Sequence, residues 1–263
     1  PIARSYLDTL ASAGAEPVVQ SKWFSTVVVT SQDSTVADRL KELTIVDSVK
    51  WVWKGTNVVT AEQEEQDERF FPADTPLKDR YGYASEQIKM LNGIKLHEAG
   101  FKGQGMTIAV IDAGYHNVDK IEAMKNIRIL GTKDFVEPGS DIYAKGSHGM
   151  AVLSCMAMND PYVMVGTAPE ASYWLLRSED EASEHLVEQD YWAAAVEFAD
   201  SVGVDVVNTS LGYFTFDDST KNYKYRDLDG HHALMSRQAS KMADKGIVLV
   251  CSAGNSGASS WKK

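Results

Sequence analysis

Residues 107–114 read Thr-Ile-Ala-Val-Ile-Asp-Ala-Gly, a short apolar run that ends in a carboxylate and a glycine. A continuous apolar run of this length between glycines is typical of a strand buried on both faces of a parallel sheet. In open parallel sheets the functional groups lie at the carboxyl ends of the strands, which is where Asp112 stands. A buried carboxylate needs a hydrogen-bonding or charged partner. Asp112 therefore either meets a partner from elsewhere in the chain or simply caps the following loop.

Helical and strand patterns alternate along the chain from residue 81 onward. Strand-like apolar runs recur after the one at 107–114, and helical stripes separate most of them. This alternation predicts an α/β fold with a doubly wound parallel sheet. The further predicted strands are 127–130, 173–176, 204–207 and 247–251, and the predicted helices are 86–91, 96–99, 148–158, 184–200 and 232–245.

The N-terminal pattern is different and predicts a small separate domain over residues 1–55. Helical and strand patterns there follow the order αββαβ, and one more strand before Pro1 would complete a ferredoxin-like unit. Residues 56–80 are acidic and carry two prolines, as is typical of a solvated linker, and residues 81–263 form the larger α/β unit. The N-terminal elements expected are a helix at 5–13, strands at 15–20 and 23–30, a helix capped by Ser34, and a strand at 46–53.

Composition and charge narrow the classes of function. The 263-residue chain has a formal net charge of −11 and no basic stripe, which argues against nucleic acid or an anionic membrane as partner. No apolar run is long enough to span a bilayer. The chain starts at Pro1 without a signal peptide, so we expect a trimmed piece. Cys155 and Cys251 stand in apolar surroundings and are expected to be buried free thiols.

His148 is the second candidate for chemistry. It lies at the predicted start of a buried helix, in Gly146-Ser-His-Gly-Met-Ala151. A single histidine at a helix start is usually structural or exposed, but flanking glycines allow backbone or substrate to approach closely. A histidine base needs a carboxylate behind it to set its tautomer and stabilise its charged form. Asp112 is the residue that we expect in that position.

Two further segments follow predicted strands. Asn255, in Ser252-Ala-Gly-Asn-Ser-Gly257, could direct an amide donor at a developing oxyanion, although asparagine is also common in plain turns. Ser210-Leu211-Gly212 could bind another chain as an added strand, or could be an ordinary strand exit. The glycines at 100, 103 and 105 precede their strand, so they do not form a dinucleotide-binding motif.

In this order, the four segments resemble the conserved blocks of the subtilisin-like serine proteases. The resemblance covers about residues 81–263 and rests on Asp112-Ala-Gly, Ser-His148-Gly-Met-Ala, Asn208-Thr-Ser-Leu-Gly and Ser252-Ala-Gly-Asn-Ser-Gly. It implies that Asp112 orients His148, that His148 acts as general base and then acid, and that Asn255 donates to the oxyanion. It also implies a substrate channel lined on both sides by Ser210, Leu211 and Gly212 and by Ser252, Ala253 and Gly254.

The resemblance extends to the N-terminal region and to the partners. It implies that residues 1–55 are an inhibitory propeptide with a processing site in the linker, and that the substrates are polypeptides. It also implies export to the periplasm, the cell surface or the medium. Calcium is common in the family, but no contiguous run of oxygen ligands in this sequence matches a site that we can assign. We therefore predict no cofactor and no particular metal ligand.

The nucleophile is the main departure from the family pattern. No Gly-Thr-Ser-x-Ala-x-Pro block is present, and Ser259 and Ser260 follow Asn255 too closely to replace it. We therefore expect an N-terminal fragment, inactive alone, whose sheet is completed by a C-terminal remainder. The unpaired edge of such a sheet would favour aggregation. The alternative is a non-catalytic module, either a peptide-binding pseudo-protease or a self-inhibited remnant.

Overall fold

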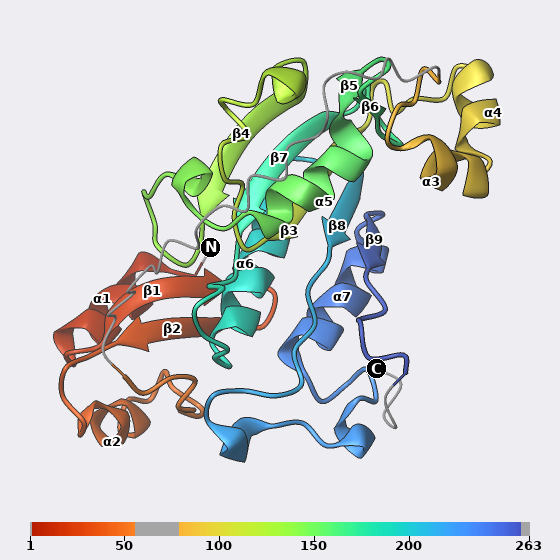
Figure 1. The fold of residues 1–263 in the computed structure, drawn as a ribbon. Helices are drawn as coiled ribbons and strands as arrows, with labels where there is room; N and C mark the ends of the chain where they lie inside the picture. The colour runs from red at the N-terminus through yellow and green to blue at the C-terminus, as the bar shows by residue number, and fades with distance from the viewer. Residues whose placement is uncertain (1, 56–78, 259–263) are drawn as a thin grey trace.

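Five parallel strands form the central sheet of the computed structural model, which describes residues 2–55 and 79–258 (Figure 1). The strand order is β4-β7-β3-β8-β9, and every neighbouring pair is parallel. Thus the chain passes from the central strand β3 to one side of the sheet and later to the other. The strands are β3 (Thr107–Asp112), β4 (Arg128–Asp134), β7 (Ser172–Arg177), β8 (Val206–Thr209) and β9 (Val248–Cys251).

Helices cover both faces of this sheet, which confirms the predicted doubly wound α/β fold. Ile108 and Val110 of β3 pack in one core with Leu153 of α5 (His148–Ala157). Ala109 and Ile111 point to the opposite face and pack in a second core beside α6 (Glu188–Ser201) and α7 (Leu234–Asp244). Since side chains alternate along a strand, burial on both faces accounts for the uninterrupted apolar run.

The N-terminal unit consists of α1 (Arg4–Ser12), the antiparallel pair β1 (Glu16–Ser21) and β2 (Thr26–Thr30), and α2 (Val36–Lys41). The third strand predicted over 46–53 is wrong, because no strand forms there. Val46 and Val49 instead pack against the core of this unit, whereas Val52 packs against the core of the large sheet. The alternating apolar residues of 46–53 therefore belong to a segment that packs between the core of the N-terminal unit and the core of the large sheet.

The cap predicted for α2 also differs. The helix begins at Val36 after Thr35, and Asp33 Oδ1 accepts the Thr35 amide hydrogen at 2.8 Å. Asp33 thus forms a turn just before the helix, and no side chain of the described residues caps α2, so the cap predicted from Ser34 is wrong.

A buried carboxylate joins the N-terminal unit to the α6–α7 side of the large sheet. Glu197 of α6 accepts hydrogen bonds from Ser21 Oγ at 2.5 Å and from the amides of Lys22 and Trp23 at 2.8 and 3.1 Å. Gln238 of α7 donates to both Glu197 and Ser21 Oγ at 3.1 Å. Because charged hydrogen bonds are stronger than neutral ones, these contacts define one docking position for the unit.

Several elements begin or end a few residues from their predicted positions. The helix predicted over 184–200 starts at Glu188, because residues 184–187 form part of the loop after β7. Cys155 and Cys251 are free thiols as predicted, but both are exposed, so their predicted burial is wrong. The other elements are α3 (Ser85–Met90), α4 (Gly93–Glu98), β5 (Asn159–Asp160), β6 (Met164–Val165) and the 3-10 turns Glu122–Met124, Ile142–Ala144, Ser219–Lys221 and Tyr225–Asp227.

Most of the predicted linker, residues 56–78, lies outside the described residues, as do Ser259 and Ser260. Among the helices that the structure describes, none is long and apolar enough to cross a membrane.

Candidate active site

Asp112 ends β3, the strand at which the chain changes direction across the sheet. Its side chain is fully buried, and its Oδ1 atom accepts the Ala113 amide hydrogen at 2.8 Å. The same oxygen lies 2.7 Å from Nδ1 of His148. Burial raises the pKa of Asp112, and the hydrogen bonds from His148 and Ala113 oppose that rise. The structure therefore brings the first two predicted site residues together.

Two close backbone approaches place His148 at this position. It is the first residue of α5, and Gly149 follows it. A Cβ atom on Gly149 would lie 2.5 Å from the Gly114 carbonyl oxygen and 2.9 Å from the Asp112 Cβ atom. A Cβ atom on Gly114 would likewise lie 2.4 Å from the Gly146 nitrogen. The start of α5 can approach the end of β3 this closely only because these positions are glycines.

The charge distribution around His148 favours its protonated form. Burial lowers the pKa of His148, but the hydrogen bond and negative charge of Asp112, followed by the charges of Glu179 and Glu181, outweigh burial and raise it overall. Because a carboxylate accepts at Nδ1, we assign the proton of the neutral ring to that atom. The side chain is 51% exposed, so a substrate can reach the ring. The pair can thus take up a proton at Nε2 and stabilise the resulting charge.

Arg177 and Tyr115 support this pair and were not singled out in the sequence. Arg177 lies beside Asp112 in the parallel register, and its Nε atom donates to the Ala113 carbonyl oxygen at 2.7 Å. The buried hydroxyl of Tyr115 donates to the Val110 carbonyl oxygen at 2.6 Å. The sequence does contain a signal for Arg177, because an arginine at the end of an apolar strand needs a buried polar partner. Tyr115 has no comparable signal, because its contacts depend on the folded loop.

The other predicted site residues leave the sheet at the same carboxyl edge. Ser210 is half-buried, Leu211 is buried and Gly212 is exposed directly after β8. The Ser252 amide donates to the Thr209 carbonyl oxygen at 3.1 Å, which extends the β8–β9 pairing by one residue. Residues 252–255, namely Ser252, Ala253, Gly254 and Asn255, are all exposed beyond the end of β9. Among the described residues, no hydrogen bond joins Asn255 to Asp112 or His148, so its role stays a prediction.

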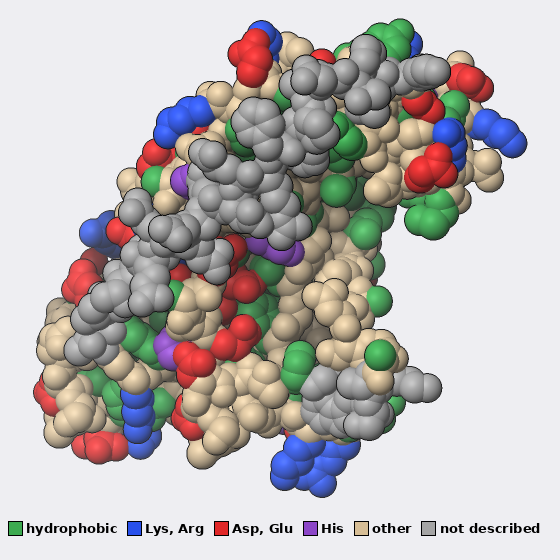
Figure 2. All heavy atoms as spheres, viewed as in Figure 1, with side chains coloured by type: hydrophobic (Ala, Val, Ile, Leu, Met, Phe, Trp, Pro, Cys, Tyr) green, Lys and Arg blue, Asp and Glu red, His purple; other side chains and the backbone are tan. Residues whose placement is uncertain are grey.

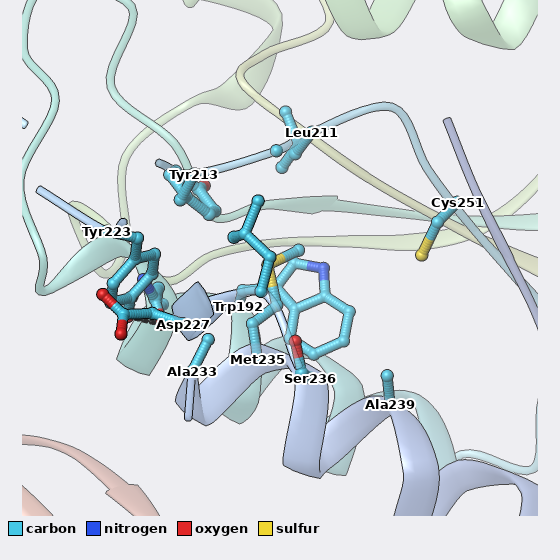
Figure 3. A pocket seen from close by; sticks show the side chains of 13 residues that line it. Trp192, Leu211, Tyr213, Tyr223, Asp227, Ala233, Met235, Ser236, Ala239 and Cys251 are labelled. Atoms are coloured by element: carbon cyan, nitrogen blue, oxygen red, sulfur yellow. Dashed lines mark hydrogen bonds between the residues drawn. The ribbon is translucent and has the colours of Figure 1, made fainter. Parts of the chain in front are cut away.

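An apolar cavity of about 200 Å³ lies beside the segment after β8 (Figure 3). Leu211, Trp192 and Tyr213 line it together with Met235 of α7, and the sulfur of Cys251 lies on its far side. Asp112 and His148 are not part of its wall. The cavity can therefore hold an apolar side chain of a bound peptide without belonging to the reacting centre.

Carboxylates lie near the pair, since the charges of Glu179 and Glu181 act on His148. Figure 2 shows acidic side chains gathered beside a histidine near the middle of the view. Burial first, and the charge of Asp112 second, raise the pKa of Glu179 to about 7. Glu179, Glu184 and Glu188 each place one oxygen within 4.8 Å of the others. They are the described residues that could hold a metal ion, and the sequence had not indicated them as a group.

Comparisons with known proteins identify the family of this chain. The Subtilase family model matches residues 103–262, and a model described as the peptidase S8 propeptide domain of Bacteroidota matches residues 1–69. Subtilisin E of Bacillus subtilis (strain 168) is 30% identical over 175 residues, which are 65% of this chain and 40% of that protein. The thermostable alkaline protease of Halalkalibacterium halodurans is 26% identical over 171 residues, which are 65% of this chain and 41% of that protein. This chain thus spans less than half the length of these two relatives.

Solved structures show the same fold. Fervidolysin from Fervidobacterium pennivorans, a keratinolytic enzyme related to subtilisin, aligns with a TM-score of 0.60 at 22% identity, over 98% of this chain and 39% of that one. The serine protease MycP1 aligns with a TM-score of 0.51 at 21% identity, over 70% of this chain and 50% of that one. The resemblance predicted from the four sequence blocks is confirmed. The chain belongs to the subtilase family of serine proteases and carries an S8 propeptide domain at its N-terminus.

Proposed function

We propose that the chain is the N-terminal part of a serine endopeptidase in its zymogen form, with the nucleophilic serine in a C-terminal remainder. The observation that carries this proposal is the 2.7 Å contact between buried Asp112 and the accessible His148 ring. A histidine held in this way can act as a general base, because its Nε2 atom faces a reactant while Nδ1 is bound. Alone, the chain lacks the nucleophile and is expected to be inactive.

The proposed reaction is acyl transfer. His148 Nε2 removes the proton from the serine hydroxyl as the serine oxygen attacks the peptide carbonyl carbon. His148 then gives the proton to the leaving amine, and a water molecule deprotonated by the same atom releases the acyl group. Asp112 orients the imidazole and stabilises its charged form throughout. The Asn255 amide donates to the oxyanion, a contribution worth about 10²–10³ in turnover when measured in a subtilisin.

Two strand exits would bind the polypeptide substrate. Residues 210–212 and 252–254 follow neighbouring parallel strands and offer extended backbone to an added strand. The apolar cavity at Leu211 and Trp192 would receive one substrate side chain. This arrangement favours a peptide bound along the carboxyl edge of the sheet, with the scissile bond beside His148.

The remaining partners follow from the same proposal. The outer strand β9 leaves Val248 and Val250 58% and 48% exposed, and a C-terminal remainder that adds further sheet would cover them. Residues 1–55 would inhibit the enzyme until cleavage within 56–80. Family membership also supports export to the periplasm, the cell surface or the medium.

A fluorophosphonate probe tests the proposal, because it labels only an activated serine. The full-length protein, freed of its propeptide, should be labelled, and His148→Ala should abolish labelling. His231→Ala, which changes an exposed histidine in the loop before α7, should leave labelling intact. A correctly folded, full-length protein that is never labelled would instead support the peptide-binding alternative.

A further inference from the structure

We infer that Glu179, Glu184 and Glu188 form a calcium-binding site in the loop between β7 and α6. This site is separate from the catalytic pair, and its proposed function is to hold the loop beside His148 in one conformation. One carboxylate oxygen from each residue lies within 4.8 Å of the other two. The three side chains come from within ten residues of chain, and the loop places them around one point.

Glu188 gives independent support for a ligand at that point. Its side chain is only 1% exposed, at the first turn of α6. Its Oε1 atom accepts the His185 amide hydrogen at 2.9 Å, whereas its Oε2 atom has no hydrogen-bond partner among the described residues. Glu184 Oε1 is also buried without a partner in this part of the chain. Buried polar atoms are normally satisfied, so these oxygens need a ligand that the protein itself does not supply.

Positive charge from the described side chains does not neutralise the cluster. The nearest arginine in sequence, Arg177, directs its guanidinium to Asp134 at 3.0 Å and to Asp180 at 3.5 Å. Within residues 2–55 and 79–258, no lysine or arginine forms an ion pair with any of the three glutamates. Burial is the largest reason that the pKa values of Glu179 and Glu184 rise to about 7 and that of Glu188 to about 9, with mutual repulsion next for Glu184. A bound cation would offset both the cost of burying these carboxylates and the repulsion between them.

Hydrogen bonds from the next loop hold the carboxylates in place. Tyr213 donates its hydroxyl to Glu179 Oε2 at 3.4 Å. The Glu184 amide donates to Asp217 at 3.2 Å, and the Asp217 amide donates back to the Glu184 carbonyl oxygen at 3.0 Å. The loop after β7 and the loop after β8 therefore fix the site together. A preformed set of oxygens loses less entropy on binding an ion than a mobile one.

The ligand set favours calcium over the other common ions. All the ligands are carboxylate oxygens, which suit hard cations and do not suit zinc, whose structural sites use cysteine and histidine. Oxygens on opposite sides of a calcium ion lie roughly 4.6–5.2 Å apart, given bond lengths of about 2.3–2.6 Å. Around magnesium the same separation is only about 4.0–4.2 Å. An upper limit of 4.8 Å between the three oxygens is compatible with both ions. Magnesium, however, is usually held by one or two carboxylates, whereas calcium takes six to eight oxygens, so three carboxylates favour calcium, with waters or backbone oxygens as further ligands.

Calcium titration of the purified 263-residue chain by isothermal calorimetry tests the site, with circular dichroism to verify folding. One site should bind, and Glu184→Gln and Glu188→Gln should each weaken binding at least tenfold. Glu181→Gln is the matched control, because it removes an exposed carboxylate from the same loop outside the cluster. Its affinity should stay within about twofold of the parent value.

Thermal unfolding supplies a second readout that needs no peptide cleavage. Calcium should raise the unfolding temperature of the parent chain and of Glu181→Gln but not that of Glu188→Gln. Without calcium, Glu188→Gln should be at least as stable as the parent, because glutamine is neutral at every pH, whereas burial raises the pKa of Glu188 to about 9 and makes its ionised form costly. A folded chain that binds no calcium at millimolar concentration would overturn the proposal, as would binding that survives both glutamine substitutions. If the three glutamates bind only a basic side chain of the substrate, the chain should bind no calcium at millimolar concentration. The proposed protease activity could hold or fail independently of every one of these outcomes.

Discussion

Arg177 and Asp112 end neighbouring parallel strands in direct register, yet they do not form an ion pair. The guanidinium binds Asp134 of β4, on the side of β7 opposite to β3, while its Nε atom donates to the Ala113 carbonyl oxygen. Asp112 thereby keeps its charge for His148, and the loop that follows it stays anchored. The same arginine positions the site without neutralising it.

We predict that Arg177→Met destabilises the chain by about 3 kcal/mol, because it leaves Asp134 charged and buried without its partner. Three retained hydrogen bonds to Asp134, from Val136, Glu137 and Ser140, keep the cost at the lower end of the usual range. Urea denaturation measures the change. Arg128→Met, an exposed position on β4, should change stability by less than about 0.5 kcal/mol. Adding Asp134→Asn to Arg177→Met should restore part of the loss, and an unchanged stability for Arg177→Met would contradict the assignment.

Gly149→Ala is predicted to move His148 away from Asp112. The added methyl group would meet the Gly114 carbonyl oxygen at 2.5 Å, and backbone cannot move aside as a flexible side chain does. We expect α5 to shift and kcat/KM of the full-length enzyme to fall at least tenfold, with the larger change in kcat. Ala151→Ser, at an exposed position of the same helix, should retain activity. Full activity in the Gly149 variant would show that the close approach is dispensable.

The acid limb of kcat/KM is predicted to lie above pH 6.5, because the neighbouring carboxylates raise the pKa of His148 and only its neutral form accepts a proton. Glu181→Gln removes one of these charges, so the limb should move to lower pH by a few tenths of a unit. Since Glu181 is exposed, the shift should shrink at high salt. Glu86→Gln, on the exposed side of α3, should leave the profile unchanged. A shift of the Glu181 variant toward higher pH would contradict the proposed electrostatics.

The same raised pKa has a consequence for stability with a definite sign. The charged His148–Asp112 pair stabilises the folded state fully below the ordinary histidine pKa, about 6.5. That contribution is lost as the pH rises through the folded-state value. His148→Ala should therefore cost more stability at pH 5.5 than at pH 9, as measured by urea denaturation at both values.

Glu197→Ala is predicted to loosen the N-terminal unit, because one carboxylate accepts three hydrogen bonds from residues 21–23. Each charged hydrogen bond is worth about 1.5–3 kcal/mol, and Gln238 would lose one of the two acceptors that it contacts, keeping Ser21 Oγ. Hydrogen exchange should quicken in β1 while β3 stays protected. Glu16→Ala, an exposed carboxylate on β1, serves as the control and should leave exchange unchanged. Equal protection in both variants would mean that apolar contacts alone hold the unit.

The two parts of the molecule differed in how well their patterns predicted structure. The strand at 107–112 and the helix from His148 were found correctly, because burial on both faces and a continuous apolar helix leave strong local signals. The strand expected over 46–53 failed, because alternating apolar residues serve equally well in an extended segment packed between two cores. The exposed thiols failed for a related reason, since Cys251 lies on the edge strand and local sequence does not show which strand is outermost.

By itself, the sequence determined the family and the two candidate catalytic residues that the structure brings together, because Asp112, His148 and their flanking glycines occur in blocks whose residue types the proposed chemistry requires. Only the tertiary structure decided what surrounds that pair. Strand order and loop packing bring Arg177 beside Asp112 and Glu197 into contact with Ser21. They also place the three glutamates close together. The physical reason is that charges act through distance in space. Residues adjacent in the chain can point apart, while residues far apart in it can share one buried site.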